Sequence, residues 1–154
     1  LAVQGIPSLE ASDVELARSG PSYTIETLRY FQKRFGLESA IHFIVGLDAF
    51  SEITTWKSFQ QLFATSHFIV MARPGSKLKD LEGFIHTHIS QEYQYDAASN
   101  QYTHPVWCTI FRLNISHLDI SATQIREWIR EGRSIRFMVP DKVDEFINEK
   151  GLYR

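Results

Sequence analysis

Residues 119–126, Asp-Ile-Ser-Ala-Thr-Gln-Ile-Arg, combine residue types that can hold phosphate at the start of a helix. If Ser121 caps the helix, the first backbone N–H groups stay free to bind an anion. The hydroxyls of Ser121 and Thr123 add donors, and Arg126 can reach back because helical side chains lean toward the helix start. The Ser-x-x-Gln pattern is also a capping box that needs no ligand, so the local chemistry alone favours a plain cap.

A carboxylate and an aromatic–cationic pair follow the apolar run at residues 41–45. Asp48 could accept hydrogen bonds from a ribose or cap the next helix, and the residues support both interpretations equally. Trp56, followed by Lys57, comes after an expected helix break. Its indole could stack on a ligand ring, although packing in the core is the commoner role of tryptophan.

Residues 20–24, Gly-Pro-Ser-Tyr-Thr, combine a turn with hydroxyl groups where a helix is expected to begin. Ser22 or Thr24 is the expected cap. The free N–H groups of such a helix start could hold a carboxylate or a phosphate. Without further context a plain helix start is the favoured interpretation.

Other common chemistries find little support in the sequence. The six histidines show no metal-binding spacing, and His86 and His88 have no cysteine partners, so we expect no metal site. Cys108 is the single cysteine, which excludes an internal disulfide and suits a reducing cytoplasm. Its apolar neighbours predict a buried thiol on a strand rather than a nucleophile.

Alternating strand and helix patterns must position these residues. Apolar runs predict strands at residues 41–45, 67–72 and 107–113, and helical spacing places helices between them and after the last. The helices are expected at about 22–35, at 50–63 as one helix or as two broken near Trp56, at 122–130, and from Pro140 to Lys150. Residues 91–104 have no period and indicate a loop or insertion, within a less readable region at 76–106. This order predicts an α/β fold with parallel strands covered on both faces by crossover helices.

The bulk properties fit one domain spanning residues 1–154. The net charge is −2 and no run of Lys or Arg occurs, so a nucleic acid is not an expected partner. No apolar run approaches the ~18 residues that cross a membrane. The chain begins without Met or a basic leader, which favours a cytoplasmic protein with a segment missing upstream.

The order of the weak signals is more specific than any one of them. Together they resemble the bacterial nicotinate-nucleotide adenylyltransferase family over most of residues 8–154. Ala122 stands where the family usually has a second serine. The segments that carry the resemblance are 21–28 (Pro-Ser-Tyr-Thr-Ile-Glu-Thr-Leu), 46–48 with Trp56, 73–75 (Arg-Pro-Gly), 120–126, Val139-Pro140 and Leu152-Tyr153.

The resemblance implies a Rossmann-like nucleotidyltransferase domain and a role for each candidate residue. Ser121, Thr123 and Arg126 would bind the phosphates of ATP. Asp48 would contact a nucleotide sugar or order the pocket. The nicotinate ring of the mononucleotide would be surrounded by Tyr23, Thr24, Trp56 and Lys57. Mg²⁺ would accompany ATP, and the oligomeric state stays open.

The sequence departs from the family at its catalytic motif. Family members begin with a strand followed by Gly-x-Phe-Asp-Pro-x-His-x-Gly-His, and these 154 residues contain no such motif. The first strand–helix unit is therefore expected to be missing, and the chain itself is expected to be inactive. The intact protein would transfer the adenylyl group of ATP to nicotinate mononucleotide. Alternatives are a nicotinamide-mononucleotide or pantetheine-phosphate adenylyltransferase, or a non-catalytic nucleotide-binding fragment.

Overall fold

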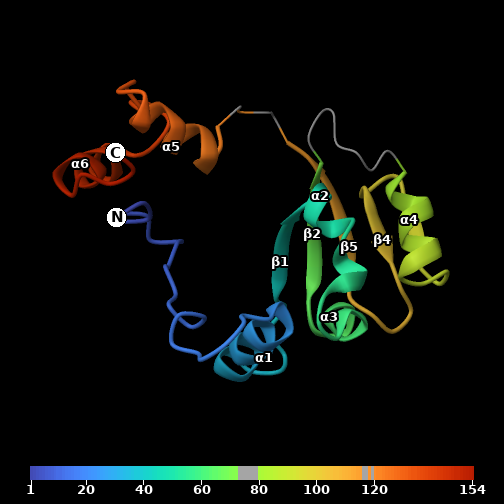
Figure 1. The fold of residues 1–154 in the computed structure, drawn as a ribbon. Helices are drawn as coiled ribbons and strands as arrows, with labels where there is room; N and C mark the ends of the chain where they lie inside the picture. The colour runs from blue at the N-terminus through green and yellow to red at the C-terminus, as the bar shows by residue number, and fades with distance from the viewer. Residues whose placement is uncertain (73–79, 116–117, 119) are drawn as a thin grey trace. The chain divides into compact units, whose positions relative to one another are not determined.

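The computed structural model describes residues 1–72, 80–115, 118 and 120–154. They form two units (Figure 1). Val14–His117 form the larger one, called here the sheet unit. Leu1–Asp13 and Leu118–Arg154 form the smaller one, called the helical unit. The predicted Arg73-Pro74-Gly75 segment and Asp119 lie outside the described residues.

The sheet unit is built on a mixed sheet with the strand order β1-β2-β5-β4-β3. Strands β1 (His42–Gly46), β2 (His67–Ala72) and β5 (Ile110–Asn114) pair in parallel. Short strands β4 (Gln101–Thr103) and β3 (Gln94–Asp96) extend the sheet in antiparallel pairing. The parallel α/β core predicted from the sequence is confirmed, and it brings the carboxyl ends of β1, β2 and β5 to one edge.

The two antiparallel strands correct the expectation of a loop at residues 91–104. They form a hairpin whose turn contains Asn100 in the left-handed region, with φ of 52°. The side chain of Asn100 accepts a hydrogen bond from the Tyr95 hydroxyl (2.9 Å) and donates one to the carbonyl of Arg112 (2.6 Å). Tyr102 is buried. Strands of three residues are too short to show an alternating pattern, so the sequence analysis did not detect them.

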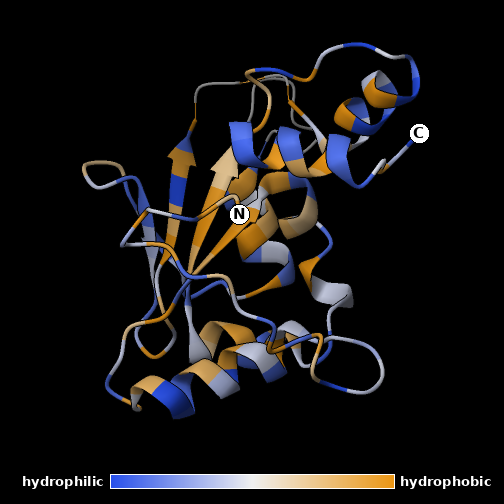
Figure 2. Ribbon diagram, turned by 90° about the vertical axis from the view of Figure 1, so that its left-hand side faces the viewer, coloured by the Kyte–Doolittle hydropathy of each residue, from blue (hydrophilic) through white to orange (hydrophobic). Residues whose placement is uncertain are grey.

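One face of the sheet carries the core of this unit. Val45, Phe68, Val70 and Ile110 are buried there against helical side chains, while Ile44, which points to the opposite face, is 58% exposed. Figure 2 shows the mainly hydrophobic strands beside helices of mixed character. Within the sheet unit, therefore, β1 is covered on one face only, and the expectation of cover on both faces is corrected.

The helices of the sheet unit follow the predicted pattern closely. Helix α1 (Thr24–Phe35) buries Ile25 and Leu28 and stops at Gly36, whose φ of 96° few other residues adopt. The predicted break near Trp56 is present, because Trp56 ends a short 3₁₀ turn before the next helix. The elements are α1 (Thr24–Phe35), α2 (Leu47–Phe50), η1 (Ile53–Thr55), α3 (Phe59–Thr65) and α4 (Leu81–His88).

Cys108 lies just before strand β5 rather than on it, because the strand begins at Ile110. The side chain is half-buried, and this burial raises the pKa of the Cys108 thiol. The predicted strand position is therefore wrong. The raised pKa favours the neutral thiol, which agrees with a structural rather than a nucleophilic role.

The helical unit contains α5 (Ala122–Arg130) and α6 (Asp141–Glu149). Both helices are present where they were predicted, but α6 begins at Asp141, one residue later than expected, with Pro140 as its N-cap residue. The amino-terminal segment belongs to the same unit, where the Gln4 side chain accepts a hydrogen bond from Lys142 (3.3 Å). In the parts of the chain that the structure describes, no helix is long and apolar enough to span a bilayer.

Candidate functional site

A cavity of about 270 Å³ in the sheet unit gathers four of the residues singled out from the sequence. Tyr23 and Thr24 come from the start of α1, and Trp56 and Lys57 from the connection between η1 and α3. Ser22 and Thr55 complete its lining. Segments separated by about 30 residues thus converge on one pocket with hydroxyl, aromatic and cationic groups.

The start of α1 is open toward a ligand. Tyr23 is the N-cap residue in an extended conformation, and no side chain caps the helix. The prediction that Ser22 or Thr24 caps the helix is therefore wrong. Glu26 is the first residue whose N–H reaches back to a carbonyl of this turn, that of Tyr23 (3.0 Å). The earlier N–H groups of the helix, those of Thr24 and Ile25, precede the first such bond and can serve an anion.

Trp56 both packs on the core and lines the pocket. Its ring meets that of Phe43 edge-on, with 6.1 Å between centroids and an interplanar angle of 78°. The indole is only partly buried. Core packing and ligand stacking, the two roles considered for Trp56 from the sequence, are thus compatible. The ring contacts Phe43 and also lines the pocket.

Lys57 is held by two contacts. Its ammonium group lies 4.1 Å from the centroid of the Tyr23 ring and donates a hydrogen bond to Oε1 of Glu26 at 2.6 Å. This hydrogen bond lowers the pKa of the Glu26 carboxyl, because it favours the charged form of the group. Sequence reasoning missed Glu26, because a partner 31 residues away leaves no local pattern.

Asp48 is placed apart from this pocket. It is an exposed residue of α2, immediately after the carboxyl end of β1, and does not line the cavity. Gly46 is the N-cap of α2, and no side chain caps that helix. The capping interpretation of Asp48 is therefore wrong, and a sugar-binding or pocket-ordering role stays a prediction.

The other predicted group lies at the start of α5 in the helical unit. Ser121 Oγ accepts a hydrogen bond from the N–H of Gln124 (3.1 Å), so the predicted cap is present. Arg126 Nη2 donates to Thr123 Oγ1 (3.4 Å), which shows that the arginine does lean back toward the helix start. Among the described residues the reciprocal half of the capping box is not formed, since the buried Oε1 of Gln124 has no hydrogen-bond partner there. Ser121 and Thr123 are exposed to solvent.

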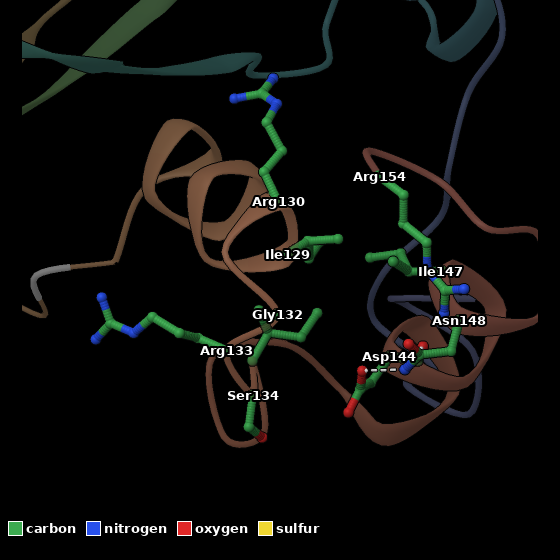
Figure 3. Close-up of a pocket in the computed structure, with 10 residues that line it drawn as sticks. Ile129, Arg130, Gly132, Arg133, Ser134, Asp144, Ile147, Asn148 and Arg154 are labelled. Atoms are coloured by element: carbon green, nitrogen blue, oxygen red, sulfur yellow. Dashed lines mark hydrogen bonds between the residues drawn. The ribbon is translucent and has the colours of Figure 1, made fainter.

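A larger cavity of about 590 Å³ in the helical unit lies between α5 and α6. Arg130, Arg133 and Arg154 line it, together with Asp144 and Asn148. Figure 3 shows the side chains of Arg130 and Arg133 extending in different directions rather than toward a common point. Arg133 stacks on Trp128, 3.9 Å from its ring centroid. The arginines thus do not converge on one anion.

Comparison with known proteins found no matching family model but many related sequences. A "Probable nicotinate-nucleotide adenylyltransferase" of Desulfatibacillum aliphaticivorans is 38% identical over 165 aligned positions, covering 99% of this chain and 72% of the relative. The protein of the same name in Citrifermentans bemidjiense is 37% identical, covering 99% of this chain and 70% of the relative. These relatives are therefore longer than the 154 residues.

Solved structures show the same fold. Plasmodium falciparum nicotinic acid mononucleotide adenylyltransferase, complexed with APC, superposes with a TM-score of 0.59 at 18% identity, covering 88% of this chain and 60% of the solved one. The same enzyme complexed with NaAD also gives a TM-score of 0.59, at 19% identity and with 58% of the solved chain covered. The chain spans about 60% of these structures, and the likeness supports the Rossmann-like architecture.

Proposed function

Because this chain belongs to the nicotinate-nucleotide adenylyltransferase family, we propose that its protein converts ATP and nicotinate mononucleotide into deamido-NAD and pyrophosphate. The 154 residues supply the ring-binding pocket and a phosphate-binding helix start. The family's histidine motif, which they do not contain, supplies the remaining charge stabilisation. A protein in which this chain is joined to that motif is called here the intact protein. The 154 residues contain one cysteine, and this low cysteine content is suited to a reducing cytoplasm, where we propose that the protein acts.

The chemistry needs no protein nucleophile. A phosphate oxygen of the mononucleotide attacks the α-phosphorus of ATP and forms a new P–O–P bond. The bond from the α-phosphorus to the bridging oxygen of the β-phosphate breaks, and pyrophosphate leaves with the electron pair. The protein therefore has to align the two phosphates and stabilise the negative charge that gathers on the α-phosphate oxygens.

The cavity at the start of α1 carries this proposal. A nicotinate ring is flat, apolar on its faces and anionic at one edge. Trp56 offers an aromatic surface held in place by Phe43, the uncapped helix start offers N–H donors, and Lys57 offers a positive charge. These are the three interactions that such a ring requires.

The start of α5 is suited to the ATP phosphates. Ser121 and Thr123 present exposed hydroxyls there, and Arg126 leans toward them. A guanidinium group at a helix start can bind phosphate through two parallel hydrogen bonds, in line with the helix dipole. Asp48, at the carboxyl end of β1, is free to accept hydrogen bonds from a ribose.

A divalent metal fits this arrangement as a companion of ATP. Among the described residues, no three His, Cys, Asp or Glu side chains come together as a metal cage. Mg²⁺ commonly binds nucleotide phosphates with only one or two carboxylates from the protein. We therefore propose that Mg²⁺ would be held mainly by the phosphates of ATP, where it would supply positive charge to the leaving pyrophosphate, while the residues above orient the substrates.

The intact protein is expected to prefer nicotinate mononucleotide to nicotinamide mononucleotide. The helix dipole adds only about 0.3–1 kcal/mol in an exposed setting, so the preference depends on the N–H donors and Lys57 acting together. The test compares kcat/KM for the two mononucleotides at saturating Mg-ATP, with pantetheine phosphate as a third acceptor. Equal values for both mononucleotides, or a preference for pantetheine phosphate, would contradict the proposal.

Replacing Trp56 by alanine is expected to weaken the use of the mononucleotide more than the use of ATP. Stacking on an aromatic ring contributes roughly 0.5–1.5 kcal/mol, so KM for the mononucleotide should rise about threefold to tenfold. Steady-state kinetics with each substrate varied in turn measures the change in KM for the mononucleotide and the change in KM for ATP separately. Trp107→Ala is the matched control, because Trp107 packs against the same core and stacks on His104 instead of lining the pocket. If Trp56→Ala lowers only the thermal stability, as we expect of the control, Trp56 has no role in binding.

A further inference from the structure

A line of polar contacts joins the segment before α1 to the pocket at its start. Thr27 Oγ1 donates a hydrogen bond to Oε1 of Glu15 (2.6 Å) and accepts one from Nη1 of Arg18 (3.0 Å). Nη2 of Arg18 donates to the backbone carbonyl of Glu26 (3.3 Å). The first turn of α1 is thus fixed from outside by Arg18, and the side chain of Glu26 is left free to face Lys57.

Lys57 is the last residue in this series of contacts, and its side chain lines the cavity. It lines the pocket, whereas Glu26 does not. A lysine side chain has considerable rotamer entropy, which it loses if a ligand has to order it. Here the hydrogen bond to Glu26 and the contact with the Tyr23 ring already restrict that freedom.

We propose that Glu26 is a positioning residue for substrate selectivity, which holds the ammonium group of Lys57 over Tyr23 where the carboxylate of a nicotinate ring would bind. The inference rests on the proposed function. A positive charge fixed in advance favours the anionic ring without the cost of ordering a mobile chain, and a neutral nicotinamide ring gains much less from it. Glu26 acts on the substrate through Lys57 rather than by contact.

The opposite role for Glu26 is simple charge balance. An acidic group near the pocket repels a carboxylate, so removing it would then improve the use of the nicotinate form. The two roles differ in sign and can be separated by experiment. They also differ in the response to glutamine, whose side-chain oxygen can still accept a hydrogen bond from Lys57 but carries no charge.

The test measures kcat/KM for nicotinate and nicotinamide mononucleotides with Glu26→Ala and Glu26→Gln variants of the intact protein. We expect the ratio of kcat/KM for nicotinate to that for nicotinamide mononucleotide to fall about threefold to tenfold in Glu26→Ala, because Glu26 removes only part of the rotamer entropy of Lys57. The ratio should fall less in Glu26→Gln, which can still accept the hydrogen bond. Glu38→Ala, which removes an exposed carboxylate from the loop after α1, is the control and should leave the ratio unchanged. The effect should disappear in a Lys57→Ala background, where Glu26 has no lysine left to position.

An unchanged or increased ratio in Glu26→Ala would overturn the proposal, and so would an undiminished effect in the Lys57→Ala background. Thermal unfolding of each variant shows whether the fold is kept, and Glu26→Gln provides a second test if Glu26→Ala is unstable. Failure of the proposed function looks different, because the unaltered intact protein would then show no nicotinate preference at all.

Discussion

The 154 residues alone, purified and supplied with Mg-ATP and nicotinate mononucleotide, are expected to form no measurable deamido-NAD. Adenylyl transfer gathers negative charge on the α-phosphate oxygens, and Arg126 with the start of α5 can stabilise only part of it. One preorganised donor can contribute about 10²–10³ in kcat, so the loss of the family's two motif histidines should lower the rate by several orders of magnitude.

A chromatographic assay for deamido-NAD, sensitive to one turnover per hour, measures this. A full-length relative such as the protein of Desulfatibacillum aliphaticivorans, prepared in the same way, is the positive control. Sustained turnover by a sample whose intact mass matches the 154 residues would contradict the expectation. A catalytic site would then have to exist within this chain, and His42, stacked on His67 at 4.9 Å between centroids, would be the first group to replace.

The same chain is expected to be poorly soluble. Strand β1 is an edge of the sheet formed by the described strands, and Ile44 on it is largely exposed. An apolar edge strand with unpaired N–H and C=O groups is a template for aggregation. The sequence pattern predicted the opposite, because a continuous apolar run such as residues 41–45 is typical of a strand covered on both faces.

Local patterns predicted the helices of this protein well. Helix α1 repeats its apolar residues every three or four positions, and Gly36 supplies the positive φ that ends it, so both features are set within a few residues. The cap of α5 by Ser121 is equally local. The start of α1 was harder to predict, since Ser22 and Thr24 are both good capping residues. In the structure Tyr23 is the extended N-cap residue, so neither of them caps the helix.

The candidate site was only partly visible in the sequence. Tyr23, Thr24, Trp56 and Lys57 were identified through family resemblance, whereas their own chemistry favoured plain structural roles. Glu26 was missed because its contact with Lys57 depends on how two distant segments pack. The residues at strand ends are predictable because parallel strands share an edge, but a side-chain pair between a helix and a loop is set by tertiary packing alone.

Arg126→Ala in the intact protein is expected to lower kcat/KM about tenfold to a hundredfold without unfolding the protein, since a lost charge-assisted hydrogen bond is worth roughly 1.5–3 kcal/mol. Among the described residues, Arg126 donates a hydrogen bond to the Thr123 hydroxyl at 3.4 Å, a long contact on which we expect little stability to depend. Arg126→Lys keeps the positive charge but loses the planar guanidinium group, so its kcat/KM should lie between those of the unaltered protein and Arg126→Ala.

Arg130→Ala is the matched control, because Arg130 belongs to the same helix one turn further on and its side chain lines the larger cavity (Figure 3). Steady-state kinetics with ATP as the varied substrate, together with thermal unfolding, distinguishes the two variants. Near-normal activity in Arg126→Ala would mean that residues 121–126 form a capped helix start and nothing more. A large loss restricted to Arg126 would assign the ATP phosphates to this helix, because only a group that meets the reacting phosphates can change the rate so strongly while leaving stability unchanged.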